Sequence, residues 1–292
     1  MIVITAPTGQ IGSQLVSNLL DSGESLRLIA RDPSRLPVAV RKHAEVVEGS
    51  HADAAVVDKA FTDADAVFWL QPSDLHAIDA RGTYLDFVKP AARAIAAHGV
   101  RRVVAVAAVG RGFTDDAGLV SLAWEAVDLL ADTGVDIREL AMPTFMDNLL
   151  WQADSIAEQG VYYEPDGSTV PRPICATRDI AAVAAELLTD PSWTGRSTRQ
   201  VLGPQDLTVD QKTMIISEVL DRDIECRQLA PEEYREQLIT GGYSPSMAQA
   251  MVAMAEAKTA GLDSHHPRTV ESTTPTSFRT WCAEVLRPAV ER

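Results

Sequence analysis

Short apolar runs alternate with amphipathic segments along the first half of the chain. Residues 2–4 form a β-branched run that fits a buried strand, and the next segment places five apolar side chains on one helical face. These are Ile11, Leu15, Val16, Leu19 and Leu20. Further apolar runs lie at residues 26–30, 45–47, 66–70, 102–107 and 137–140, with helical periodicity at residues 54–61, 78–98 and 119–131. The pattern predicts an α/β fold with a doubly wound parallel sheet.

A parallel sheet of this kind binds ligands beyond the carboxyl ends of its strands. In this sequence those ends are residues 5–12, Arg31, Ser50, 70–72, 107–110 and 142–143. We therefore expect any nucleotide and its reaction partner to lie along this edge. The reactive end of the nucleotide should lie near the following five residues: Leu70, Gln71, Pro72, Ala107 and Pro143.

The second half of the chain has a different character, because helical periodicity replaces the alternation with strands. A helix is predicted over residues 174–188, and Met247, Met251 and Met254 form a stripe at helical spacing. Such a stripe is either core or a pliable wall for an apolar ligand. The expected division gives the sheet domain residues 1–148, about 174–204 and 275–292. A smaller, mostly helical substrate lobe is expected from about 149–173 and 205–274, with the last helix packing back.

The turn after the first strand is suited to binding a pyrophosphate. Gly9 and Gly12 let the backbone approach the anion closely, and the N-terminus of the following helix offers unpaired N–H groups. Thr8, Gln10 and Ile11 complete the expected contact segment. Ala6 occupies the place of the first glycine of the usual fingerprint, where alanine fits if its φ is negative. The alternative interpretation is an ordinary turn between a strand and a helix.

The second strand ends in an arginine, where an NAD-binding sequence would carry an acid for the ribose hydroxyl. Arg31 stands at this place and Arg35 follows one turn later. A guanidinium suits a 2′-phosphate and offers no acceptor to a hydroxyl group. The two arginines therefore predict NADP(H) as the cofactor, unless Arg31 merely ends a strand at the solvent edge.

Composition narrows the classes of partner. The net charge of −15 disfavours nucleic acid and anionic membrane as partners. The three cysteines are far apart in the sequence and indicate reduced thiols. No leader or long apolar run is visible, so we expect a cytoplasmic protein. We expect it to be a monomer or a homodimer. No metal site is expected, because the adjacent His265 and His266 rarely converge on one ion and are expected to be solvated.

The chain resembles the NmrA-like branch of the atypical short-chain dehydrogenases over nearly its whole length. The resemblance rests on the order of several motifs. These are Ala6-Pro7-Thr8-Gly9-Gln10-Ile11-Gly12, Ala30-Arg31-Asp32-Pro33-Ser34-Arg35-Leu36, Val100-Arg101-Arg102-Val103-Val104, Pro143-Thr144-Phe145-Met146-Asp147-Asn148, Thr177-Arg178-Asp179-Ile180-Ala181, Thr194-Gly195-Arg196 and Leu202-Gly203-Pro204. It implies an NAD(P)-binding Rossmann fold, usually with NADP(H). Members of the family include reductases of quinones and other conjugated or aromatic substrates, and also redox-sensing regulators without catalysis.

The sequence departs from the wider dehydrogenase pattern at the residues that transfer the proton. Ser121 and Glu125 fall at the places of the usual Tyr and Lys, and neither can copy a phenol assisted by a lysine. The acid that commonly follows the third strand is replaced by Gly49-Ser50, so Ser50 or a backbone group is expected to hold the adenine. No catalytic residue is therefore assigned from the sequence.

Four residues are candidates for contact with a small-molecule substrate: Trp124, Phe145, Asn148 and Trp151. The aromatic residues form either lobe core or a wall beside the nicotinamide, and Asn148 either binds substrate or fixes its loop. The leading hypothesis is an NADPH-dependent reductase of a quinone-, enone- or imine-like substrate that acts by direct hydride transfer. The alternatives are a non-catalytic NADP(H) sensor, or an isomerase or cyclase on the same scaffold.

Overall fold

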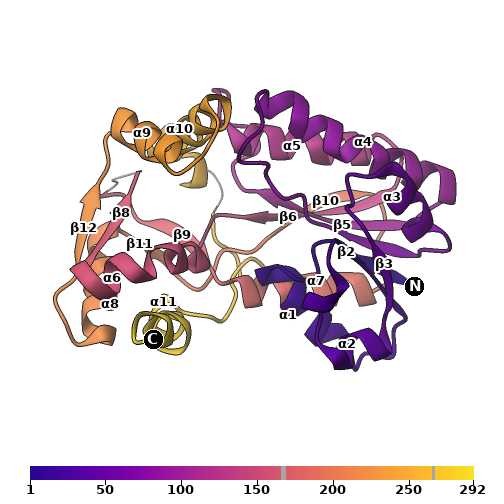
Figure 1. Cartoon of the computed structure of the whole chain (residues 1–292), viewed down its shortest axis with the longest axis horizontal. Helices are drawn as coiled ribbons and strands as arrows, with labels where there is room; N and C mark the ends of the chain where they lie inside the picture. Colours follow the sequence, from indigo (N-terminus) through magenta and orange to yellow (C-terminus); the bar gives the residue numbers. More distant parts are fainter. Residues whose placement is uncertain (166–168, 265–266) are drawn as a thin grey trace.

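The computed structural model describes residues 1–292 except 166–168 and 265–266, so His265 and His266 lie outside the described residues. A seven-stranded sheet forms the centre, with strand order β10-β6-β5-β4-β1-β2-β3 (Figure 1). Its strands are β1 (Ile2–Ile4), β2 (Leu26–Ala30), β3 (Glu45–Glu48), β4 (Ala66–Trp69), β5 (Arg102–Ala108), β6 (Asp136–Met142) and β10 (Arg196–Gln200). Every neighbouring pair in this sheet is parallel. The predicted doubly wound α/β fold is confirmed.

Helices cover both faces of the sheet (Figure 1). One layer contains α1 (Gln10–Leu19) and α7 (Thr177–Thr189), and the other contains α3 (Ala54–Phe61), α4 (Ala80–His98) and α5 (Leu119–Ala131). The 3₁₀ turn η1 (Pro33–Arg35) and α2 (Val38–His43) connect β2 to β3.

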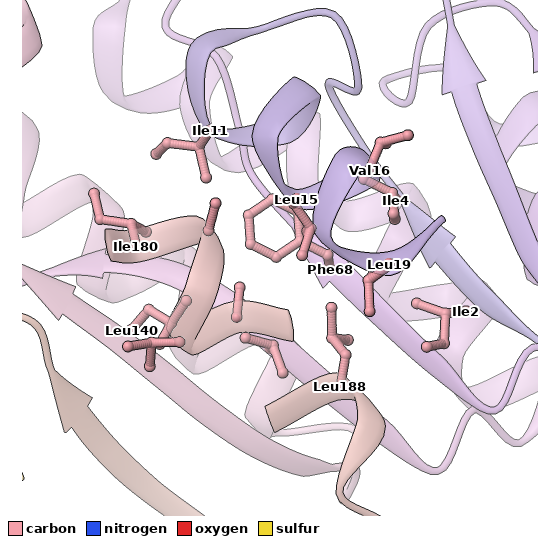
Figure 2. Packing of buried hydrophobic residues seen from close by; sticks show 14 of the residues in the cluster. Ile2, Ile4, Ile11, Leu15, Val16, Leu19, Phe68, Leu140, Ile180 and Leu188 are labelled. Carbon is pink, nitrogen blue, oxygen red and sulfur yellow. The ribbon is translucent and has the colours of Figure 1, made fainter. Parts of the chain in front are cut away.

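Two separate apolar cores result. Figure 2 shows Leu15 and Leu19 of α1 against Ile4 and Phe68 of the sheet, with Leu188 of α7 beside them. The intervening strand residues, such as Val3 and Val67, pack into the opposite core with α3, α4 and α5. Because both faces of each strand are covered, the strands appear in the sequence as continuous apolar runs.

The lobe is built around two small sheets, with strand orders β11-β9-β7 and β12-β8. Its strands are β7 (Thr144–Phe145), β8 (Val161–Glu164), β9 (Arg172–Cys175), β11 (Asp206–Leu207) and β12 (Glu225–Gln228). Its helices and turns are η2 (Met146–Gln152), α6 (Ala153–Gln159), α8 (Val209–Leu220), α9 (Pro231–Thr240), α10 (Pro245–Thr259) and η3 (Leu262–Ser264). None of the helices in the described ranges is long and apolar enough to cross a membrane.

The C-terminal segment packs into the lobe, which differs from the expectation that residues 275–292 join the sheet domain. It comprises α11 (Phe278–Trp281), the π-helical turn η4 (Cys282–Leu286) and α12 (Arg287–Val290). Phe278 and Trp281 are buried in the lobe core together with Ile216 of α8. Periodicity shows that a helix has a buried face, but it does not show which core that face joins. The link to the sheet domain is polar, since Thr276 donates to Asp179 of α7 from N and Oγ1, at 3.0 and 2.7 Å.

The methionine stripe of α10 lies in the interface between the lobe and the sheet domain. Met247 is buried against Ala77 and Leu122, and Met254 packs near Val120 of α5. The interface is tight, because a Cβ at Gly118 would lie 1.9 Å from the carbonyl oxygen of Ala250. Met247 is therefore core, the first of the two alternatives drawn from the sequence, whereas Met251 and Met254 are half-buried.

Candidate active site

The turn after β1 brings the backbone of α1 unusually close to the strand. A Cβ at Gly12 would lie 2.1 Å from the carbonyl oxygen of Ala6, so only glycine fits there without a shift of the backbone. Ala6 has a φ of +49°, and the expectation of a negative φ at this position is wrong. The tight turn requires the left-handed conformation, and an alanine adopts it here at a cost in strain.

The N-terminus of α1 has free hydrogen-bond donors. Gly9 is the N-cap, no side chain caps the helix, and the first turn carries no acid. Gly9 and Gln10 are exposed and Thr8 is half-buried, whereas the Ile11 side chain is buried, so Ile11 offers only its backbone N–H. An uncapped helix N-terminus with an approachable backbone attracts a phosphate, and a pyrophosphate fits this turn.

Arg31 and Arg35 flank this turn on the adjoining strand end. Both side chains are exposed, and neither forms an ion pair or a hydrogen bond with any residue that the structure describes. Asp32 lies between them and accepts hydrogen bonds from Ser34 N at 2.9 Å and from Ser34 Oγ at 2.6 Å. The bond from the Ser34 hydroxyl is the main cause of the lowered pKa of Asp32. The carboxylate is thus used as a cap, whereas the two guanidinium groups remain open to an anion.

The end of β3 carries a residue that sequence reasoning missed. His51 is 7% exposed, and its ring packs edge-on against Trp69 and Phe87, with centroid distances of 5.3 and 4.9 Å. Burial lowers the pKa of His51 to about 4, so the ring is neutral near pH 7. The preceding Ser50 is half-buried, and its Oγ accepts from Ala52 N at 3.2 Å within the turn.

The end of β4 is held by residues that follow β1 and β3. Leu70 N donates to Thr5 Oγ1 at 2.8 Å, and Leu70 O accepts from the His51 ring at 3.0 Å. Gln71 donates from Nε2 to Tyr84 O at 2.6 Å, while its buried Oε1 has no hydrogen-bond partner among the described residues. Pro72 is exposed. This fixed segment presents an unsatisfied amide oxygen and open backbone near the edge where the cofactor is expected.

The end of β5 is covered by the lobe and by α5. Ala107 is buried, Trp124 Nε1 donates to Ala108 O at 3.0 Å, and Leu262 packs so closely on Gly110 that a Cβ there would lie 2.5 Å from it. Trp124 is thus fixed against the strand end by its indole N–H. Its role toward substrate stays a prediction.

The residues after β6 differ widely in their surroundings. Pro143 is buried, Phe145 packs at the edge of the core under α1 and α7, and Trp151 is 76% exposed. Asp147 is buried and accepts from Thr177 N and Oγ1 at 3.0 and 2.8 Å, so it anchors α7. The Asn148 side chain is half-buried and hydrogen-bonds to none of the described residues, so it does not fix the loop. Among the substrate candidates, Asn148 therefore has a free amide, whereas Trp151 faces solvent.

Ser121 and Glu125, which stand where related dehydrogenases have the catalytic Tyr and Lys, both form contacts within the fold. Ser121 Oγ accepts from Ala117 N at 3.0 Å, one turn earlier at the start of α5. Glu125 is paired with Arg81 of α4 at 2.5 Å, with 38% of its side chain exposed. Neither group copies the usual relay, because Ser121 is no phenol and Glu125 is engaged in an ion pair.

A nearly buried lysine of the lobe reaches the strand edge instead. Lys258 Nζ of α10 donates to Thr144 Oγ1 at 2.6 Å and to Asp263 Oδ2 at 3.2 Å. The Lys258 and Asp263 side chains are 12% and 4% exposed. Sequence reasoning missed this contact, because it joins residues 114 positions apart. The only sequence signal is that Thr144 immediately follows the Pro143 strand end.

A cavity of about 320 Å³ lies at the ends of β5, β6 and β10. Its lining is rich in polar and charged groups, among them Arg111, Thr198 and Glu271. Arg111 is itself bound to the buried Glu139 at 2.6 Å and to Asp128 at 3.0 Å. This cavity therefore differs from the apolar pocket expected for a conjugated substrate.

Comparison with known proteins agrees with this architecture. The chain matches the NAD(P)H-binding family over residues 7–191. It is 32% identical over 288 residues to a (4-alkanoyl-5-oxo-2,5-dihydrofuran-3-yl)methyl phosphate reductase of Streptomyces griseus, covering 97% of each chain. Two solved structures share the fold at 18% identity. The first is the triphenylmethane reductase of a Citrobacter species complexed with NADP(H), with a TM-score of 0.80 over 97% of this chain and 99% of that chain. The second is an NADPH-dependent quinone oxidoreductase of Escherichia coli complexed with NADPH, with a TM-score of 0.79 over 98% of this chain and 99% of that chain.

The family match begins in the turn after β1 and includes every strand end described above except that of β10. The relative from Streptomyces griseus extends the similarity through the lobe to nearly the whole chain. The chain is therefore an oxidoreductase that belongs to the NAD(P)H-binding family, in the NmrA-like branch of the atypical short-chain dehydrogenases.

Proposed function

We propose that the protein is an NADPH-dependent reductase of a small, apolar, conjugated substrate. The observation that carries this proposal is the state of Ser121 and Glu125, which are held by Ala117 and Arg81. A simple ketone needs a proton donor for its developing alkoxide. A conjugated acceptor spreads the charge over several atoms and has less need of a strong acid.

The preference for NADPH over NADH is supported by the two exposed arginines. Arg31 and Arg35 form no ion pair with the described residues, so a 2′-phosphate could bind them without breaking existing contacts. The uncapped N-terminus of α1 would hold the pyrophosphate. When bound, NADPH would supply the hydride, and the protein would supply position and electrostatics.

The chemistry of the compound named for one relative narrows the substrate class that we propose. The compound named for the Streptomyces griseus relative carries a ring double bond conjugated with two carbonyl groups. Addition of a hydride to its β-carbon leaves an enolate delocalised over both carbonyls, and water can protonate such an enolate. We therefore place a doubly activated enone ahead of quinones and imines as the substrate of this chain.

Spectroscopic assay of NADPH consumption tests the proposal. The panel should contain an acylated butenolide, a quinone, an imine and a simple ketone, each at equal concentration. We expect the butenolide or the quinone to be reduced at least about 100-fold faster than the ketone, the size of a general-acid contribution. Tight NADPH binding without consumption on any acceptor would contradict the proposal and favour the NADP(H)-sensing alternative.

A further inference from the structure

The pair formed by Thr144 and Lys258 has an unused donor. Thr144 Oγ1 accepts from Lys258 Nζ at 2.6 Å, and the hydroxyl hydrogen of Thr144 has no acceptor among the residues that the structure describes. Asp263 holds the ammonium group from the other side at 3.2 Å. A hydroxyl that accepts from a cation is polarised, so its own O–H becomes a stronger donor.

The pair lies where the lobe meets the carboxyl ends of the strands of the central sheet. Thr144 is the second residue after β6, whose end is paired with that of β5 through Met142 and Ala108. Leu262, four residues after Lys258, packs on Gly110 just beyond β5. The donor therefore lies at the strand ends where a parallel sheet binds the reacting groups.

We propose that Thr144 is a catalytic hydrogen-bond donor to the substrate oxyanion, and that Lys258 is the positioning residue that polarises its hydroxyl. The inference rests on the proposed reduction of a conjugated carbonyl compound. A hydride adds to the β-carbon, the π electrons move to the carbonyl oxygen, and Thr144 donates to that oxygen. Water then protonates the α-carbon, so the substrate gains one hydride and one proton. A preorganised donor of this kind stabilises charge that develops only in the transition state.

Binding of 4-nitrophenol to the full-length protein with NADP⁺ tests the oxyanion site without turnover. Its absorbance reports the fraction of bound phenolate, which is a stable mimic of the enolate. We expect the pKa of bound 4-nitrophenol to fall by about one unit relative to the free compound, as for an acid beside a cation. Thr144→Val and Lys258→Met should remove this shift, while Lys258→Arg should retain part of it.

Thr213→Val is the matched control. Thr213 is a lobe threonine whose Oγ1 lies 2.8 Å from the Tyr162 hydroxyl, away from the strand ends. We expect this variant to keep the phenol shift and the rate. In steady-state assays, Thr144→Val and Lys258→Met should lower kcat at least about 10-fold, without changing the KM for NADPH. If Lys258→Met does not fold, Thr144→Val decides alone, because it removes the donor and leaves the Lys258–Asp263 ion pair intact.

The outcomes separate this inference from the proposed function. An unshifted phenol pKa in the unmodified protein, or the same shift in Thr144→Val, overturns the oxyanion site even if enones are reduced. A shift that depends on Thr144 and Lys258, in a protein that reduces no acceptor, supports the oxyanion site and overturns the proposed reductase.

Discussion

The imidazole Nε2 of His51 lies 3.0 Å from the carbonyl oxygen of Leu70. Because a carbonyl oxygen can only accept, Nε2 carries the hydrogen, and Nδ1 of the neutral ring is left as an acceptor. The same peptide segment is held from the other side by Thr5 Oγ1, which accepts from Leu70 N. The two contacts join the ends of β1, β3 and β4, which together form the expected floor of the cofactor site.

Acidification should destabilise the protein through His51. Its pKa is lowered to about 4 by burial, below the unfolded value, so the neutral ring favours folding above about pH 6.5. This contribution is lost as the pH falls toward the folded pKa, by about 2 kcal/mol at pH 5. Urea denaturation at pH 7 and pH 5 measures the difference. His51→Gln keeps an N–H donor and should show a smaller loss; an equal loss in both proteins would assign the effect to other groups.

Removal of both arginines should abolish the preference for NADPH. Arg31→Ala with Arg35→Ala should weaken NADPH binding by about 1.5–3 kcal/mol for each lost charged hydrogen bond, while NADH binding changes little. Isothermal titration with both cofactors measures this. Arg93→Ala is the control, since Arg93 is exposed on α4. Equal affinity of the unmodified protein for NADPH and NADH would contradict the assignment.

Ala6→Gly should stabilise the protein, although it introduces a glycine. The φ of +49° strains an alanine, and relief of that strain should exceed the entropy that glycine adds to the unfolded chain. The expected gain is about 0.5–1 kcal/mol in the free energy of unfolding. Ala55→Gly, at an exposed position of α3, should instead cost about 1 kcal/mol. Chemical denaturation of the two variants should therefore give changes of opposite sign, and destabilisation by both would refute the strain at Ala6.

Ser121→Ala and Glu125→Gln should retain most of the activity. The exposed Glu125–Arg81 pair contributes about 0–1 kcal/mol to stability, and Ser121 lacks the acidity of a phenol assisted by a lysine. We expect kcat/KM on a conjugated acceptor to fall less than about 10-fold. A fall beyond about 100-fold with unchanged NADPH affinity would identify one of the two as a general acid or base.

Local patterns identified the sheet well, because strands covered on both faces must be apolar throughout. The run at residues 66–70 corresponds to β4, and the helix expected at residues 78–98 is α4, which begins two residues later at Ala80. The helix expected at residues 174–188 was too long, since it begins at Thr177, after β9. The apolar residues Ile174 and Cys175 of β9 continue directly into the buried face of α7, so periodicity alone could not separate them.

The missed features all depend on contacts between distant parts of the chain. Burial of His51 requires Trp69 and Phe87, which come from β4 and α4. The Lys258–Thr144 contact requires α10 to fold back over the end of β6. The exposure of Trp151 follows in the same way from the packing of η2, which turns Met146 and Leu149 into the lobe core and leaves Trp151 outside. A sequence pattern gives the face of an element, but the neighbour of that face is fixed only by tertiary packing.

The composition of the lobe core has a consequence for biosynthesis. Its buried side chains come from three stretches, which run from Met146 to Ala176, from Leu207 to Ile224 and from Phe278 to Leu286. The stretch from Phe278 to Leu286 is synthesised after the other two, so the lobe core cannot close until this stretch has left the ribosome. The parallel sheet can assemble earlier, because β10 ends at Gln200. The nascent protein thus carries a formed sheet and an unfinished lobe until Phe278 to Leu286 emerge, and a premature stop before Phe278 would leave the apolar faces of α8 and η2 without their cover.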